Sequence, residues 1–189
     1  MGRPRVRDKI IVAAQQLLAS KGASALTTKA VASEAGVTEA SLFNNFGDKA
    51  GLIRVLIEEQ AGEFSTFEQA LLAGVDGSFE DWLAAVLMTA RDYFSFVLPL
   101  AAPQLLLAQS VKQQGNSYTG HRPLASRLSQ LQQQGWLPSG VDVEATALLI
   151  MGAAMHSALT GLTMGDDALG GSIDSWARRI ASSLVLPIG

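Results

Sequence analysis

Residues 27–46 read TTKAVASEAGVTEASLFNNF, the pattern of two short helices joined at a glycine. Thr27 or Thr28 can cap the first helix and Thr38 the second. Gly36, between them, permits the positive φ angle that a sharp turn between helices needs. Because a helix of about eight residues is only marginally stable alone, the two are expected to depend on packing for their stability.

The second of these helices has two different faces. Leu42 and Phe46, at positions i and i+4, predict a buried side. The side chains left on the outer face are Thr38, Glu39, Ser41, Asn44 and Asn45. A DNA major groove admits one α-helix, and its base edges pair with donors and acceptors on such side chains. The pattern is therefore that of a helix-turn-helix, whose second helix enters the groove. A helical hairpin with a merely soluble face fits the pattern equally well.

A longer pattern around this stretch is more specific. Its residues are Ala25-Leu26-Thr27-Thr28, Val31-Ala32, Ala35-Gly36-Val37-Thr38, Leu42-Phe43, Phe46, Lys49 and Leu52. The pattern, over about residues 8 to 57, closely resembles the N-terminal DNA-binding signature of the TetR family of transcriptional repressors. The resemblance implies an all-α fold, with a helix-turn-helix DNA-binding domain over residues 1–50 and a helical ligand-binding and dimerisation bundle over residues 51–189.

The resemblance also implies which residues meet DNA. They are Thr28, Lys29, Thr38, Glu39, Ala40, Ser41, Phe43, Asn44, Asn45 and Lys49. Thr28 and Lys29 begin a helix, where exposed backbone N–H groups suit a phosphate. Phe43 stands where the family usually has a tyrosine, so it offers no hydroxyl to a phosphate, a loss of about 1 kcal/mol. Arg3, Arg5 and Arg7 either reach the minor groove as an arm or form a disordered tail.

Charge is distributed unevenly along the chain. Residues 1–57 hold eight Lys and Arg against four Asp and Glu, whereas residues 58–189 hold six against thirteen. A mildly acidic protein can bind a polyanion when its positive charge is local. The sequence contains no cysteine, which excludes disulfides and thiolate metal sites and fits a cytoplasmic protein.

The rest of the chain keeps a helical period. A first helix is expected to end at Lys21 and Gly22. The later expected helices run from the Asp48 cap to about Leu72, from Ser78 to a stop at Pro99, from Pro103 to Lys112, from Leu124 to near Gly135, from the Asp142 cap to about Leu162, and from Ile173 to Leu186. No alternating strand pattern stands out.

The second domain is expected to bind a small, largely apolar effector and to dimerise. The predicted pocket residues are Trp82, Met88, Tyr93, Phe94, Tyr118, Met151, Met155 and His156. Most would equally suit an ordinary core, and His156 would suit a buried histidine with satisfied hydrogen bonds. The predicted dimer residues are Ala147, Ile150, Ala154, Ala158, Trp176, Ile180 and Leu184, on helices that could form a four-helix interface or an intramolecular core.

Other classes of function fit less well. The uncharged run 145–165 is long enough to test as a membrane span, but its hydroxyl groups, histidine and glycines favour a buried or interface helix, so no membrane partner is expected. The sequence lacks the common hydrolase, phosphate-loop and metalloprotease motifs, so neither an enzyme nor a cofactor or metal site is expected. The main alternative is a helical adaptor that binds protein and no DNA.

Overall fold

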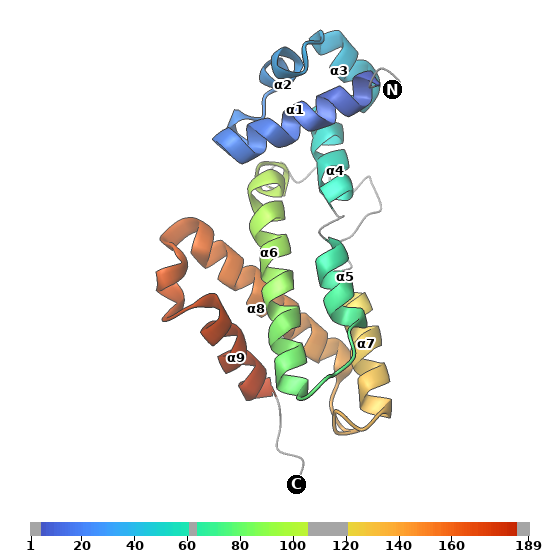
Figure 1. The fold of residues 1–189 in the computed structure, drawn as a ribbon, viewed down its shortest axis with the longest axis vertical. Helices are drawn as coiled ribbons and strands as arrows, with labels where there is room; N and C mark the ends of the chain where they lie inside the picture. Colours follow the sequence, from blue (N-terminus) through green and yellow to red (C-terminus); the bar gives the residue numbers. More distant parts are fainter. Residues whose placement is uncertain (1–4, 61–63, 106–120, 185–189) are drawn as a thin grey trace. The chain divides into compact units, whose positions relative to one another are not determined.

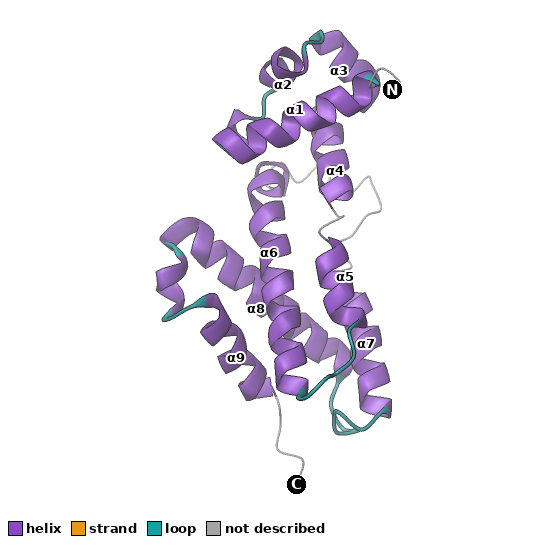
Figure 2. Ribbon diagram, viewed as in Figure 1, coloured by secondary structure: helices purple, strands orange, loops and turns teal. Residues whose placement is uncertain are grey.

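Helices make up the regular structure of the chain in a computed structural model that describes residues 5–60, 64–105 and 121–184 (Figure 1). The α-helices are α1 (Val6–Lys21), α2 (Thr28–Ala35), α3 (Glu39–Phe46), α4 (Lys49–Gln60), α5 (Phe64–Leu72), α6 (Phe79–Leu105), α7 (His121–Gln133), α8 (Val143–Met164) and α9 (Ile173–Leu184). Two short 3₁₀ turns, η1 (Ala23–Ala25) and η3 (Asp166–Leu169), join them. Within these ranges no strand occurs (Figure 2), which confirms the all-α prediction.

The chain divides into two compact units. One comprises Met1–Gly62 and Pro99–Val111, and the other comprises Glu63–Leu98 and Lys112–Gly189. The first therefore contains α1 to α4, and the second contains α5, α7, α8, α9 and most of α6. The domain boundary predicted at residue 50 stands at the start of α4, within the first unit.

The predicted N-caps form hydrogen bonds. The Thr27 hydroxyl accepts from the Ala30 N–H at 3.1 Å, and Thr38 accepts from the Ser41 N–H at 3.1 Å. A carboxylate oxygen of Asp142 accepts two backbone N–H groups at the start of α8, both at 3.0 Å. Each cap satisfies donors that the first helical turn leaves without a partner.

The prediction that Pro99 ends a helix is wrong. Helix α6 continues through Pro99 and Pro103 to Leu105. A proline inside a helix removes a hydrogen bond and costs about 3 kcal/mol, but apolar residues are buried on both sides of Pro99, as at Phe94 and Leu100. The burial of Phe94 and Leu100 offsets the free-energy cost of the proline. The proposed helix 103–112 lies otherwise outside the described residues.

The helix expected from Asp48 to Leu72 is described as two helices, α4 and α5, and the residues between them lie outside the description.

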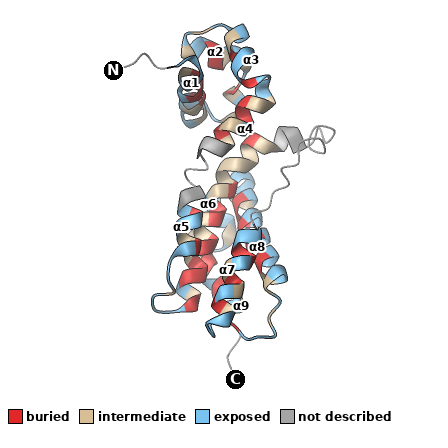
Figure 3. Ribbon diagram, turned by 90° about the vertical axis from the view of Figure 1, so that its right-hand side faces the viewer, coloured by how far each residue is buried: buried red, intermediate tan, exposed pale blue. Residues whose placement is uncertain are grey.

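The core of the second unit lies among α5, α6, α7, α8 and α9 (Figure 3). Its largest fully buried side chains are Phe67, Leu83, Leu87, Leu124, Leu128, Leu131 and Ile150. The rings of Phe79 and Trp82 stack with centroids 5.4 Å apart. Burial of each such side chain contributes about 1.5–3 kcal/mol, so these helices are held mainly by apolar packing.

One buried cation crosses this core. The Arg91 side chain on α6 is 7% exposed and forms an ion pair with Asp166 in η3. Its Nε donates to the buried Ser157 hydroxyl on α8 at 3.2 Å. Gly161 makes room for the guanidinium, because a Cβ there would lie 2.7 Å from an Arg91 nitrogen. The polar contacts thus hold α6, α8 and η3 in one register.

Two helices, α6 over Phe79–Ala101 and α8, are long and apolar enough to cross a membrane by length and composition. Both contribute one face to the core described above. A helix that is apolar around most of its circumference is also expected in the core of a soluble bundle.

Candidate nucleic-acid interface

The first three helices form a small packed unit. Ile10 and Ala14 on α1, Val31 on α2 and Leu42 on α3 are each fully buried. Gly36 between α2 and α3 has φ 64° and ψ 37°, the left-handed conformation expected for this turn. Its own N–H reaches carbonyls in the last turn of α2, which closes the first helix before the second begins. The geometry is that of a helix-turn-helix.

The first turns of α2 and α3 are joined by a direct hydrogen bond. The Thr28 hydroxyl donates to a carboxylate oxygen of Glu39 at 2.7 Å. Thr28 is the first residue of α2 and Glu39 is the first residue of α3. A carboxylate at a helix N-terminus is also favoured by the helix dipole. This hydrogen bond therefore fixes the two side chains relative to each other, at the surface where α2 and α3 begin.

The remaining polar groups of α3 differ in how they are engaged. The Thr38 and Ser41 hydroxyls lie 2.9 Å apart, and the Asn45 amide donates to the Ser41 carbonyl at 2.7 Å. Among the described residues, no hydrogen bond engages the Asn44 side chain. Phe43 is 43% exposed, so an apolar surface stands beside the amides. The outer face of α3 is thus a mixed polar and apolar surface of modest depth.

The end of α3 is tied to both neighbouring helices. The Asp48 carboxylate accepts the Gly51 N–H at 2.7 Å and so caps α4, as predicted. The Arg7 guanidinium, on the first turn of α1, lies 5.7 Å from the centre of the Phe46 ring. A cation over an aromatic face is attracted by about 0.5–1 kcal/mol at an exposed site. Arg7 therefore belongs to α1 rather than to a free tail, whereas Arg3 lies outside the described residues.

The ten predicted DNA contacts fall in the same unit. Thr28 and Ser41 are partly exposed, and the other eight side chains are exposed. They lie at the start of α2, along α3 and at the start of α4, where Lys49 is the first residue. Their chemistry is mixed, with cations, hydroxyls, amides and one carboxylate. That set can supply both phosphate contacts and contacts to base edges.

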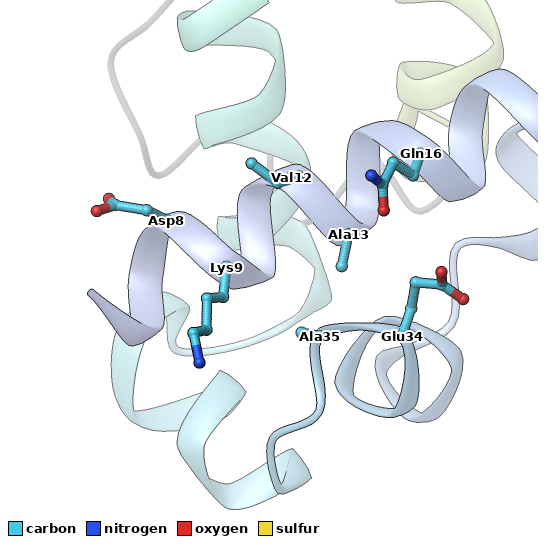
Figure 4. Close-up of a pocket in the computed structure, with 7 residues that line it drawn as sticks. All are labelled: Asp8, Lys9, Val12, Ala13, Gln16, Glu34 and Ala35. Carbon is cyan, nitrogen blue, oxygen red and sulfur yellow. The ribbon is translucent and has the colours of Figure 1, made fainter. Parts of the chain in front are cut away.

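A cavity of about 280 Å³ opens in the same unit between α1 and α2 (Figure 4). It is lined by Asp8, Lys9, Val12, Ala13, Gln16, Glu34 and Ala35. None of the ten predicted DNA contacts lines it, so this hollow is separate from the surface of α3.

The predicted effector residues that the structure describes lie in different environments. Trp82, Phe94 and Met151 are buried in the core of the second unit, and Met88 and Tyr93 pack against it. Burial raises the pKa of the Tyr93 hydroxyl. Met155 and His156 are exposed on α8, so the reading of His156 as a buried core histidine is wrong. Tyr118 lies outside the described residues.

A cavity that the sequence did not suggest lies between α5 and α7. Its volume is about 340 Å³, and it is lined by Glu68, Leu71, Leu72, Pro123, Ser126, Arg127 and Gln130. The Arg127 Nε is buried there and has no hydrogen-bond partner among the described residues, whereas its other nitrogens donate to the Gln130 side chain and the Ala73 carbonyl. The only sequence signal was the helical period of α5 and α7, which does not show where two helices leave a gap.

The predicted dimer residues are mostly in the core of one chain. Five of them are at most 6% exposed in the single chain: Ala147, Ile150, Ala154, Ala158 and Trp176. Ile180 and Leu184 pack against the same core. The opposite face of α8 is apolar and exposed, at Leu148, Leu149, Met155, Leu159 and Leu162. Helix α8 is apolar on both faces, and its predicted dimer residues lie on the face that packs within the chain.

Comparison with known proteins identifies the DNA-binding unit. Residues 10–56 match the model of the bacterial regulatory proteins of the tetR family. Residues 10–56 therefore form a DNA-binding domain of the TetR family. An uncharacterised HTH-type transcriptional regulator of Bacillus subtilis (strain 168), YvkB, is 45% identical over 53 residues. Those residues are 28% of this chain and 28% of that protein, so the likeness in sequence covers less than a third of either chain.

Solved structures extend the likeness in fold to the whole chain. The fatty acid degradation regulator FadR of Bacillus halodurans matches with a TM-score of 0.68 and 17% identity, over 100% of this chain and 98% of that one. Bacillus subtilis FadR in complex with stearoyl-CoA matches with a TM-score of 0.65 and 20% identity, over 96% and 99%. The likeness in fold therefore extends over α5 to α9. The TetR family consists of regulators rather than enzymes, in agreement with the prediction from sequence.

Proposed function

We propose that this TetR-family chain is a transcriptional regulator, a repressor by the habit of its family, that binds a palindromic operator as a homodimer in the cytoplasm. The observation that carries the proposal is the outer face of α3, which presents small, polar and apolar groups on a rigid helix within a helix-turn-helix. Such a helix fits the major groove, and its first turn contacts base edges.

The dimer is proposed to form through the exposed face of α8 rather than through the residues predicted from sequence. Leu148 and Leu149 at one end, and Leu159 and Leu162 at the other, are 48–62% exposed in the single chain. A contiguous exposed apolar stripe of this kind marks an interaction surface. A second copy of the same helix would cover it symmetrically. Two recognition helices about 34–36 Å apart would then meet successive turns of DNA.

The effector is proposed to be a small molecule that is largely apolar. The structure of Bacillus subtilis FadR holds stearoyl-CoA, and the second unit of this chain offers an apolar core with a cavity beside it. That cavity combines Leu71, Leu72 and Pro123 with the guanidinium of Arg127, a combination that suits an apolar body carrying an acidic group. Because effector and operator would stabilise different conformations, each would weaken the binding of the other.

The test is to incubate the purified protein with a random-sequence duplex library and to sequence what it retains. Recovery of an inverted repeat is expected. Enrichment of nothing, at low and moderate salt alike, would reject DNA recognition and leave the protein-binding adaptor. A panel of fatty acids and their acyl-CoA thioesters, each with an apolar chain and at least one acidic group, is added to the retained duplex to test the effector separately. Release of DNA by some chain lengths is expected, and no release by any member would reject this effector class.

A further inference from the structure

The polar groups on α3 do not all remain available to DNA. Thr38 and Ser41 satisfy each other and the helix cap, and the Asn45 amide is engaged with its own helix. Glu39 keeps free acceptor positions, because a carboxylate can accept about four hydrogen bonds and Thr28 fills one. Glu39 is also the first residue of α3, the end of a recognition helix that contacts base edges.

The hydrogen bond from Thr28 changes what that residue can do. A hydroxyl has one proton to donate, and Thr28 donates it to Glu39 at 2.7 Å. A phosphate can only accept, so while this bond persists the Thr28 hydroxyl has nothing to offer the DNA backbone. The Thr28 side chain therefore orients the Glu39 carboxylate. Lys29, the next residue in the chain, remains as the cation that can contact the phosphate.

We infer that Glu39 reads a cytosine in each half-site by accepting from its N4 amino group, with Thr28 as a positioning residue. The inference rests on the proposed operator binding. In the major groove, guanine presents only acceptors, and thymine presents an acceptor and a methyl group. Neither base can donate a hydrogen bond to a carboxylate. Adenine has an amino donor but an acceptor, N7, beside it. Cytosine offers a donor with no adjacent acceptor, which suits Glu39 best.

The charge of Glu39 makes the assignment specific. A carboxylate near two phosphate strands is repelled by them, so it weakens binding wherever no base donor compensates. Glu39 therefore selects against incorrect bases as well as for cytosine. A glutamine at the same place would have both a donor and an acceptor and could pair bidentately with adenine N6 and N7.

The experiment is selection from a random duplex library with the whole chain, three test variants and one control variant. Wild type is expected to return half-sites with one invariant cytosine. Glu39→Gln should move that position toward adenine, with the cytosine preference falling about tenfold. Thr28→Val, which keeps the shape and removes the hydroxyl, should relax the same position, and Thr28→Ser should restore it. Folding of each variant is checked by circular dichroism.

Glu34→Gln is the matched control. It removes the same charge from an exposed carboxylate in the same unit, but one that lines the hollow between α1 and α2 (Figure 4). Its motif should equal that of wild type. If Glu39→Gln also returns the wild-type motif, or if the wild-type motif contains no cytosine that Glu39 controls, the inference is wrong and the proposed function stands. If wild type enriches nothing, the proposed function itself fails, and the base assignment with it.

Discussion

A single missing side chain shapes the junction between the recognition helix and the next helix. Gly51 lies in the first turn of α4, and a Cβ on it would lie 1.9 Å from the Phe46 carbonyl oxygen at the end of α3. The obstruction is backbone, which cannot rotate away as a flexible side chain can. The glycine therefore allows α4 to begin directly against α3.

Replacing Gly51 should damage the helix-turn-helix. For Gly51→Ala we expect a loss of about 1–3 kcal/mol in the free energy of unfolding, the usual cost of forcing atoms into a packed site. Urea denaturation measures it. Gly140→Ala is the control, because a Cβ at Gly140 meets nothing within 4 Å, and it should change stability by less than about 0.5 kcal/mol. Equal stability of both variants would show that the junction tolerates a shift.

Lys49 should act on DNA through its charge alone. It is exposed as the first residue of α4, where it can neutralise one phosphate. Lys49→Ala should weaken binding to all sequences alike and reduce the slope of log K against log salt by about one. The same titration on Lys21→Ala, at the far end of α1, should leave the slope unchanged. An unaltered slope for Lys49→Ala would remove it from the predicted contacts.

Helix α6 is linked to α9 by a network at the element scale. Arg178 on α9 donates to Asp81 on α6 at 2.7 Å and to Asp174 in its own helix at 3.1 Å. Hydrogen bonds from the Ser78 hydroxyl, which has the larger effect, and from Arg178 hold the pKa of the Asp81 carboxyl below its ordinary value of 3.8. The predicted cap at Ser78 is therefore also one side of a contact between helices distant in sequence.

That lowered pKa gives stability a defined pH dependence. A carboxyl whose pKa is lower in the folded state stabilises the fold above its unfolded pKa, and the stabilisation is lost as pH falls through the folded value. Asp81→Asn should therefore unfold at lower urea than wild type at pH 7, and the difference should shrink once pH falls below about 4. Arg178→Gln should reduce the same difference in part. A gap between wild type and Asp81→Asn that persists at pH 2 would mean that protonation of Asp81 is not its origin.

At the scale of the whole molecule, one face of α8 is not covered by any part of the chain that the structure describes. Leu149 is 62% exposed and Leu159 is 51% exposed, while the opposite face lies in the core. Substitution on the exposed face should leave the folded chain intact and act only on assembly. This separates the proposed dimer surface from the residues predicted from sequence, whose replacement would unfold the chain.

The double variant Leu149→Glu, Leu159→Glu should be monomeric. Like charges on both copies and the loss of apolar contact would oppose pairing, and sedimentation equilibrium measures the outcome. Operator affinity should fall by about 100-fold or more, because the second half-site is no longer linked to the first. Leu72→Glu, on the 79% exposed Leu72 of α5, is the control and should remain dimeric. A dimeric double variant would place the interface elsewhere.

The sequence by itself determined the features that depend on neighbours along the chain. Helical period, the caps at Thr27, Thr38 and Asp142, and the left-handed turn at Gly36 arise within a few residues, so local chemistry was enough to predict them. The surface of α3 was predictable for the same reason, because the buried positions Leu42 and Phe46 leave its other face outside.

Only the tertiary structure decided the features that depend on distant partners. Helix α8 is apolar around most of its circumference, so periodicity could not show that Ala147 and Ala154 face the core while Leu148 and Met155 face outward. Helix α6 continues past Pro99, where the sequence pattern predicts a stop, and apolar side chains are buried before and after that proline, at Phe94 and Leu100. The bond between Thr28 and Glu39 joins residues eleven positions apart, and no local rule places them in contact.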